Sequence, residues 1–362
     1  MSGGVIQLVA KGAQDEWLTG EPQVSFFRSS FRRYTHYASS VERSVIAGNP
    51  TAGNISTVRL ERKGDLVNYM YLIAKDTHGA LVPSVAWNTV IDRVSLWIGG
   101  QMIDEQDITW MTQVEPITGA VTSSQRYLND LSSPAQTNAT SGFLPLKFFF
   151  NKDWKFSLPM IALQFHDVEV RITWASTLPV YQYEMWSNYI FLDEAERNFF
   201  SQSKMDMLIS QVHRVPISPT NVMDISLAQP VKYLVFPSVV YSTVAQTTPD
   251  MSKYYLKTQI NGTDVGDSRA LFQYQDVSQY YHTPYGYMPN NTCPPVTIIS
   301  YCLDTSATQP TGSLNFSRLD SFRLVAPTGS TISLLAGGAR YLYAVNYNIL
   351  RIEKGAGAVL YA

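Results

Sequence analysis

The sequence predicts an all-β protein made of two antiparallel sandwiches in tandem, with a few short helices. Apolar and polar residues alternate in many short segments, and clusters of Gly, Pro, Asn and Asp separate these segments roughly every ten residues. Helical periodicity is confined to a few short stretches. The chain has 362 residues, which is too long for one ordinary sandwich and suits two domains of common size.

Two hairpins are predicted in the first half of the chain. Ile55 to Arg62 alternates, Gly64-Asp65 supplies a turn, and Leu66 to Ala74 returns as an apolar strand. The segment from Val94 to Asp104 contains two strand-like halves around the turn Gly99-Gly100. Both patterns are typical of adjacent antiparallel strands.

Further strands are predicted in both halves of the chain. They span Phe143 to Phe150, His166 to Trp174, Tyr189 to Leu192, Val231 to Phe236, Tyr254 to Ile260, Val296 to Cys302, Ser321 to Val325 and Tyr341 to Ile352. Asn261-Gly262 follows one of them directly and favours a type I′ hairpin turn.

Helical patterns are few and short. Asp107 to Val114 and Ser268 to Tyr281 each fit a helix, while Asp193 to Lys204, which lacks Gly and Pro, fits a helix or a connector between the sandwiches. We place the boundary between the two sandwiches near residues 201–206, where Phe199-Phe200 gives way to a polar run.

The charge content argues for a surface that is covered by partners. Asp, Glu, Lys and Arg make up 15% of the residues, against about 25% in an average soluble protein. Such a chain hides surface against partners or keeps it hydrated with uncharged polar side chains. The net charge of −2 gives no basic field, so we expect no direct binding of nucleic acid.

The cysteines and the N-terminus indicate a cytoplasm-like compartment. Only Cys293 and Cys302 are present, and two cysteines are no disulfide framework, so buried free thiols are favoured over a bridge, which stays open. The N-terminus lacks the basic region and the long apolar stretch of a signal peptide, and residue 2 is not the Gly that myristoylation needs. No apolar stretch approaches the 18 or so residues that span a bilayer.

No catalytic, cofactor or metal site is predicted. The five histidines are scattered, without the spacing of zinc or iron ligands. For His166, beside Asp167, we expect a local hydrogen bond. Gly262 to Asp267 resembles a calcium loop but lacks the downstream Glu, so a hydrated turn is favoured.

Two other function classes stay open. A glycoside hydrolase would need paired carboxylates, for which the candidates are Asp193, Glu194 and Glu196. A carbohydrate-binding or adhesin β-protein would need an exposed aromatic platform, for which the candidates are Tyr280, Tyr281, Tyr285 and Tyr287.

Asn-x-Ser/Thr sequons occur at five positions. Asn54, Asn138, Asn261 and Asn290 are retained as possible glycan sites, whereas Asn315 is expected within an ordered strand and is a poor candidate. Without a signal peptide we expect the secretory route to these glycans to be closed.

Several motifs in order along the chain resemble the major capsid proteins of nucleocytoplasmic large DNA viruses, in particular those of algal phycodnaviruses. In the first half these are Gln7-Leu-Val-Ala10, Gly12-Ala-Gln-Asp15, Leu18-Thr-Gly20, Phe26-Phe27, Arg32-Arg-Tyr-Thr35, Gly64-Asp65-Leu66, Ile98-Gly-Gly-Gln101, Phe148-Phe-Phe-Asn151, Ile161-Ala-Leu-Gln164 and Tyr189-Ile-Phe-Leu-Asp193. In the second half they are Gly312-Ser313, Asn315-Phe-Ser-Arg318, Asp320, Asn346-Tyr-Asn348 and Leu350-Arg-Ile352. Residues from about 205 to 310 match poorly, and the chain has shorter insertions than its chlorella-virus counterparts, which leaves open a capsid paralogue of lower abundance.

The resemblance implies two eight-stranded antiparallel jelly rolls, at 25–204 and 205–362, preceded by an N-terminal arm at 1–24. Three copies would form a capsomer of pseudo-hexagonal outline, and capsomers would tile an icosahedral shell above an inner membrane. The protein would be made in the host cytoplasm and reside in the virion. In some relatives, glycans are added to surface loops by virus-encoded machinery, which keeps the four sequons as candidates.

The same resemblance gives candidate assembly residues. The arm would lie at the base of the capsomer and contact minor capsid proteins or neighbouring capsomers. Candidate contacts are Gln7, Leu8, Asp15, Arg32 and Arg33, with Arg32 and Arg33 expected to meet protein partners more than membrane headgroups. Arg318 and Asp320, two apart on one predicted strand, are expected to form an ion pair or hydrogen bonds at a roll–roll or subunit boundary, with an exposed surface pair as the alternative.

Overall fold

The structure is a computed structural model that describes residues 3–119, 140–237, 254–284, 296–337 and 339–361. The chain forms two compact units, Met1–His36 and Tyr37–Ala362. The first unit contains the short helices α1 (Gly3–Ile6), η1 (Gln7–Val9) and α2 (Glu16–Thr19). Its apolar side chains Leu8, Trp17, Phe26 and Phe27 are 83–98% exposed, so this unit presents an apolar surface to its surroundings.

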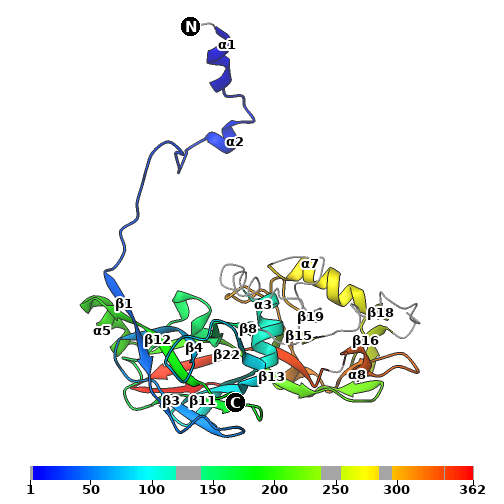
Figure 1. Ribbon diagram of the computed structural model, residues 1–362. Coiled ribbons are helices and arrows are strands. Elements are labelled where there is room, and N and C mark those ends of the chain that lie inside the picture. The colour runs from blue at the N-terminus through cyan, green and yellow to red at the C-terminus, as the bar shows by residue number, and fades with distance from the viewer. Residues whose placement is uncertain (1–2, 120–139, 238–253, 285–295, 338, 362) are drawn as a thin grey trace. The chain divides into compact units, whose positions relative to one another are not determined.

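The second unit begins with a sandwich of two antiparallel sheets (Figure 1). One sheet has the order β1-β12-β4-β10, with β9 also paired to β4, and the other has the order β2-β3-β11-β6-β7. The strands are β1 (Tyr37–Ser44), β2 (Ile46–Ala47), β3 (Ile55–Arg59), β4 (Leu66–Lys75), β6 (Ile91–Ile98), β7 (Gln101–Asp107), β9 (Phe143–Leu146), β10 (Leu158–Pro159), β11 (Val168–Trp174) and β12 (Gln182–Leu192), and a separate ribbon pairs β5 (Val85–Ala86) with β8 (Thr140–Ser141).

Strict alternation builds the core of this first roll. In β11 every second residue, from Val168 to Trp174, is buried, as expected for a strand with one face on the core. The indole N–H of Trp174 donates to the Ser56 hydroxyl at 2.8 Å, and its ring lies 4.9 Å from that of Tyr183. The short helices of this roll are η2 (Trp87–Thr89), η3 (Trp110–Val114), α3 (Glu115–Thr118), η4 (Phe149–Asn151) and η5 (Trp154–Phe156).

The second roll repeats the two-sheet arrangement. One sheet has the order β13-β22-β15-β19, with β20 paired to β15 and β23 to β22; the other has the order β14-β21-β16-β17, with β18 paired to β16. The strands are β13 (Met205–Pro216), β14 (Val222–Asp224), β15 (Pro230–Pro237), β16 (Tyr255–Ile260), β17 (Thr263–Asp264), β18 (Arg269–Ala270), β19 (Val296–Ser300), β20 (Leu314–Asn315), β21 (Phe322–Val325), β22 (Tyr341–Glu353) and β23 (Ala356–Val359). The helices are η7 (Gln273–Val277), α7 (Ser278–His282), η8 (Phe316–Arg318) and α8 (Ile332–Leu335).

The central strands β15 and β22 of the β13-β22-β15-β19 sheet are buried on both faces over most of their length, whereas the edge strand β13 is only partly buried. In β22, Leu342 and Ala344 pack into the core of the second roll, whereas Tyr343 and Val345 join the apolar cluster of the first roll. A strand covered on both faces loses its polar alternation, which explains why Val231 to Phe236 is a continuous buried run in β15. The two rolls therefore share one sheet as a common wall.

Most predicted elements are confirmed. Gly99 and Gly100 turn β6 into β7 with φ of 57° and 81°, and Asn261 and Gly262 turn β16 into β17 with φ of 50° and 76°, as type I′ turns require. The segment from Asp193 proves to be both helix and connector: α5 (Glu194–Gln202) joins the rolls, and the Asp193 carboxylate accepts from the Glu194 N–H at 2.8 Å. All-β tandem sandwiches with short helices are confirmed as the fold class.

The first predicted hairpin is wrong. β3 pairs with β2 and β11, whereas β4 pairs with β12, β10 and β9 in the opposite sheet. The turn residue Asp65 is tied to β12, since its N–H donates to the Ile190 carbonyl at 3.0 Å and its carboxylate accepts from the Leu192 N–H at 2.9 Å. The chain therefore crosses between sheets here instead of returning alongside itself.

Candidate functional site: assembly surfaces

The junction between the rolls is made by a helical segment of the first roll. This segment lies on the face of the β13-β22-β15-β19 sheet that points away from the core of the second roll, called its outer face below. The segment η3–α3 follows β7, and its side chains include the buried Trp110, Met111 and Val114. The Trp110 ring lies 5.5 Å from the ring of Tyr343 on β22. An apolar helix surface on an apolar sheet face supplies most of the contact.

A buried carboxylate fixes this helical segment to the sheet. One oxygen of Asp107 accepts from the backbone N–H of Trp110 at 2.9 Å, and the other accepts from the Tyr343 hydroxyl at 2.7 Å. Burial raises the pKa of Asp107 above its usual range, although both hydrogen bonds oppose the shift. The residue therefore connects β7, η3 and β22 from a largely buried position.

A second buried carboxylate joins the strand edges. Asp104 on β7 accepts from the Val212 N–H of β13 at 2.9 Å and from the Gln106 side chain at 2.8 Å. Beside it, Arg214 of β13 forms an ion pair with Glu105. Burial raises the pKa of Asp104 as well.

The C-terminal strands complete the junction. The Val359 N–H donates to the Gln101 side chain at 3.1 Å, and the Phe165 N–H donates to the Gly355 carbonyl at 2.9 Å. The His166 ring lies against Gly357, with Nδ1 at 3.0 Å from the Gly357 carbonyl oxygen. The expected local hydrogen bond of His166 is therefore wrong: it bonds to the other roll, and Asp167 pairs with Arg59 at 2.7 Å.

The second roll carries an equivalent helical segment that is exposed. In the first roll the segment η3–α3 precedes β9, and in the second the segment η7–α7 precedes β19. Tyr274 and Gln275 are buried in their own roll, but Phe272, Val277, Tyr280 and Tyr281 are 39%, 42%, 61% and 70% exposed. The apolar face of α7 is thus available for contact.

The first roll carries the matching sheet face, also open. A groove of about 1080 Å³ runs over the outer face of β4 and β9. Aromatic rings line it: Tyr69 lies 6.4 Å from Tyr71 and 6.2 Å from Trp154, and Tyr71 lies 6.1 Å from Phe143. The sheet β1-β12-β4-β9 occupies the same place in its roll as β13-β22-β15-β19 does in the other, so this groove is equivalent to the face that η3–α3 covers.

Comparison with known proteins identifies the family. Residues 25–193 match the family described as "Major capsid protein N-terminus", and residues 196–358 match "Large eukaryotic DNA virus major capsid protein". The chain is 30% identical to the major capsid protein of Paramecium bursaria Chlorella virus 1 and 28% identical to that of Pyramimonas orientalis virus, over the full length of each chain. The chain belongs to the major capsid proteins of large eukaryotic DNA viruses.

Solved structures support the same fold for this capsid protein. A subunit of the quasi-atomic model of the PBCV-1 virus capsid has a TM-score of 0.73 at 24% identity, covering 93% of this chain and 100% of that chain. The Faustovirus major capsid protein has a TM-score of 0.59 at 11% identity, covering 95% of each chain. The double jelly roll is confirmed, and the role of the protein is structural, as a component of the virion, and not enzymatic.

The predicted assembly residues near the N-terminus of the capsid protein all belong to its first unit, with Arg32 and Arg33 beyond the arm expected at 1–24. Gln7, Leu8, Asp15, Arg32 and Arg33 are all exposed within Met1–His36. The Asp15 carboxylate accepts from the Gly12 N–H at 2.9 Å, which shapes the turn before α2. Their role as contacts stays a prediction.

Arg318 and Asp320 do not lie on one strand, which corrects their predicted placement. Arg318 ends the short helix η8, which the Asn315 side chain caps, and Asp320 follows in a loop where its N–H donates to the Asn261 side chain at 2.9 Å. Both residues are exposed. A local helix cap outweighs strand propensity here, and any boundary role remains to be tested.

Of the possible glycan sites, two are described by the structure. Asn54 is exposed in a loop, and its side-chain amide donates to the Thr51 hydroxyl at 2.6 Å. Asn261 is exposed in its turn, and its side-chain oxygen accepts from the N–H groups of Asp320 and Ser321. Asn138 and Asn290 lie outside the described residues, as does Cys293, so its pairing with the buried Cys302 stays untested.

The alternative chemistries find little support in the described parts of the capsid protein. Asp193 and Glu194 serve as the cap and first turn of α5, and Arg197 pairs with Asp65 at 3.2 Å. Within the described ranges no group of three His, Cys, Asp or Glu side chains could hold a metal, and no helix is long and apolar enough to cross a membrane. Tyr280 and Tyr281 are exposed, while Tyr285 and Tyr287 lie outside those ranges.

Proposed function

We propose that three copies of this chain close into a capsomer of pseudo-hexagonal outline, in which the helical segment η7–α7 of each copy occupies the aromatic groove of the next. The observation that carries the proposal is the repeated geometry. The first roll covers the outer face of the second with η3–α3, while the equivalent segment and the equivalent face both remain exposed.

The surfaces suit a ring. The proposed contact joins two different patches, α7 on one copy and the groove on another, and such heterologous contacts close into rings when the rotation allows. The contact inside the chain sets that rotation, because the two rolls have the same sheet order. Three chains then present six similar rolls. Exposed aromatic side chains on both patches match the composition of stable interfaces.

Further features of the capsid shell are proposed from the family. Capsomers would tile an icosahedral shell over an inner membrane, after synthesis in the host cytoplasm. We assign the arm to 1–24, with rolls at 25–204 and 205–362, and assign contacts with minor capsid proteins to Gln7, Leu8, Asp15, Arg32 and Arg33. The exposed apolar side chains of the first unit support this role.

Charges placed on α7 test the ring. We expect the wild-type protein to have a mass near three times the 40.6 kDa of one chain in light scattering, and the variant Tyr280→Asp/Tyr281→Asp to shift toward the single-chain mass. Two carboxylates placed against the groove aromatics would lose their hydration, and of the two lysines on the groove wall Lys147 is buried and Lys152 already donates to Ser210. Val180→Asp is the matched control, because Val180 is 85% exposed and lies outside both patches. A double variant that keeps the wild-type mass would reject the contact.

Deletion of residues 2–20 separates the arm from the rolls. We expect the truncated protein to keep the unfolding temperature and mass of the full chain, because the described side chains in this stretch belong to neither buried cluster. Assembly of capsomers into shells, followed by electron microscopy, should fail. A truncated protein that does not fold or form trimers would show that the arm belongs to the core.

A further inference from the structure

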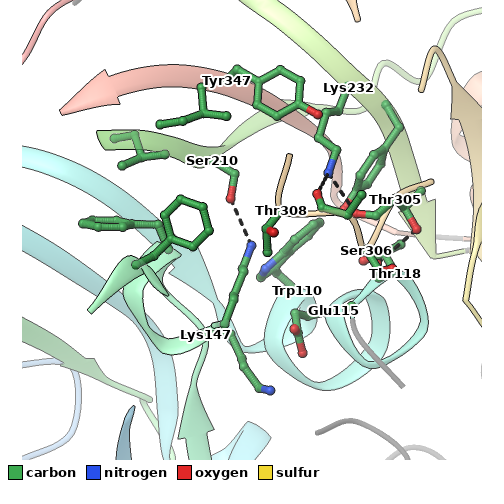
Figure 2. A pocket seen from close by; sticks show the side chains of 18 residues that line it. Trp110, Glu115, Thr118, Lys147, Ser210, Lys232, Thr305, Ser306, Thr308 and Tyr347 are labelled. Atoms are coloured by element: carbon green, nitrogen blue, oxygen red, sulfur yellow. Dashed lines mark hydrogen bonds between the residues drawn. The ribbon is translucent and has the colours of Figure 1, made fainter. Parts of the chain in front are cut away.

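A small cavity lies at the junction of the rolls, and it shares Lys147 and Lys152 with the wall of the aromatic groove. It is bounded by α3 and η4 of the first roll and by β13, β15 and the loop around Thr305 of the second. Figure 2 shows Trp110, Ser210, Lys232 and Thr308 arranged around it. Side chains from both rolls therefore meet around one small, partly open space.

The cavity gathers more positive than negative charge. Lys147 and Lys232 are only 8% and 4% exposed, and Lys152 also lines the space, whereas Glu115 is the acidic side chain on its wall. The Lys232 ammonium donates to the carbonyls of Thr305 and Ala307 at 3.0 Å each, and that of Lys152 donates to the Ser210 hydroxyl at 3.1 Å. Among the described residues none of the three lysines forms a direct ion pair, and the single carboxylate on the wall, Glu115, balances only part of their charge.

Burial and mutual repulsion act on these ammonium groups. Burial lowers the pKa of Lys232 to about 8, and the charge of Lys152 adds to that shift. Burial also lowers the pKa of Lys152, with Glu115 and Asp104 opposing the shift and Lys147 adding to it. Three lysines beside one lining carboxylate leave an excess of positive charge, which is costly to bury, and an anion among them would reduce that cost.

An unpartnered donor also lines the space. The indole N–H of Trp110, on a residue that is 1% exposed, has no hydrogen-bond partner within the described part of the chain. The hydroxyls of Ser306 and Thr308 line the same wall. A buried donor of this kind needs an acceptor, and the cavity offers mainly donors.

We propose that this cavity binds a small tetrahedral oxyanion such as inorganic phosphate, held by Lys147, Lys152 and the indole N–H of Trp110. The space open to the centres of water molecules is about 70 Å³, and one water needs roughly 10–15 Å³ of such space. The cavity thus exceeds the space of a single water molecule and leaves room for a compact ion such as phosphate or sulfate. Bound between the rolls, the ion stabilises the folded chain in proportion to its concentration.

Thermal unfolding of the full chain tests the site. At constant ionic strength, we expect phosphate to raise the unfolding temperature progressively while chloride does not, and calorimetry to give one ion per chain. Lys147→Met and Trp110→Phe should each weaken phosphate binding roughly tenfold or more, since a hydrogen bond to a charged group is worth about 1.5–3 kcal/mol. Lys11→Met, in the exposed arm, should bind as the wild type does.

The second variant keeps the test valid if the first does not fold, because Phe keeps an aromatic ring at this buried position while it removes the indole donor. Phosphoserine and ATP are parallel arms that distinguish a free ion from a phosphate on a larger molecule. A response to those two alone would overturn the assignment to a free ion. An equal response to chloride, or undiminished binding in Lys147→Met and Trp110→Phe, would overturn the site itself.

Discussion

Asp107→Ala is expected to lower the free energy of unfolding by about 3–5 kcal/mol, because it leaves the backbone N–H of Trp110 and the Tyr343 hydroxyl buried without an acceptor. These two groups lie on the helical segment and on the shared sheet, so the loss loosens the junction of the rolls. Urea unfolding followed by tryptophan fluorescence measures the change. A loss below about 1 kcal/mol would show that the junction does not depend on this carboxylate.

Asp107→Asn is the matched control, and it also tests the direction of the pKa shift. The side-chain amide oxygen of Asn still accepts from the backbone N–H of Trp110, so we expect a smaller loss of unfolding free energy than for Ala. The pKa of Asp107 is raised in the folded state, so between the unfolded and folded pKa values the folded chain binds more protons and its stability falls as pH rises. The wild type should therefore gain stability relative to Asp107→Asn as pH is lowered from 7 toward 4. A constant difference would contradict a raised pKa.

Gly99→Ala is expected to destabilise the protein by about 2–4 kcal/mol. Gly99 has φ of 57°, which costs an L-residue about 1 kcal/mol, and an added Cβ would lie 2.2 Å from Nδ1 and 2.5 Å from Cγ of His166. The ring would have to move and lose its contact with Gly357 in the other roll. Thermal unfolding and proteolysis near the C-terminus should both report this change.

Gly100→Ala separates backbone strain from the contact with His166. Gly100 has a similar φ of 81°, but a Cβ there would meet no atom within 4 Å. We expect a loss of only about 1 kcal/mol, from the left-handed backbone alone. Equal losses at the two glycines would mean that His166 does not link the rolls.

Much of the fold could be predicted from the sequence because strands with one buried face alternate. β11 follows this pattern from Val168 to Trp174, and the two-residue turns at Gly99-Gly100 and Asn261-Gly262 are specified by residues that accept positive φ. Which strands pair is a different matter. β3 and β4 each have a buried face, and alternation alone does not say whether the two faces belong to one sheet or to opposite sheets.

The junction could not be predicted because its sequence resembles an exposed strand. β7 reads Gln-Met-Ile-Asp-Glu-Gln-Asp, yet Asp104, Gln106 and Asp107 are buried and bonded to partners up to 236 residues away. The sequence does contain one signal of the junction between the rolls. The unbroken apolar runs of β15 and of Tyr341 to Val345 in β22 indicate sheets covered on both faces, and only a second roll could cover the outer one.

One chain can specify an assembly by repeating the parts of its own internal junction. The contact of η3–α3 with the shared sheet is complete within the chain, whereas η7–α7 and the aromatic groove are the same two parts left apart. Low overall charge and exposed aromatic side chains on both patches favour burial against another copy.

A cryo-electron microscopy structure of the purified, assembled protein most directly tests the proposed contact between α7 of one copy and the aromatic groove of the next. We predict three chains in a closed ring, with α7 of each chain seated over Tyr69, Tyr71 and Trp154 of the next. A ring or other oligomer in which α7 faces solvent and the groove is empty would contradict the account.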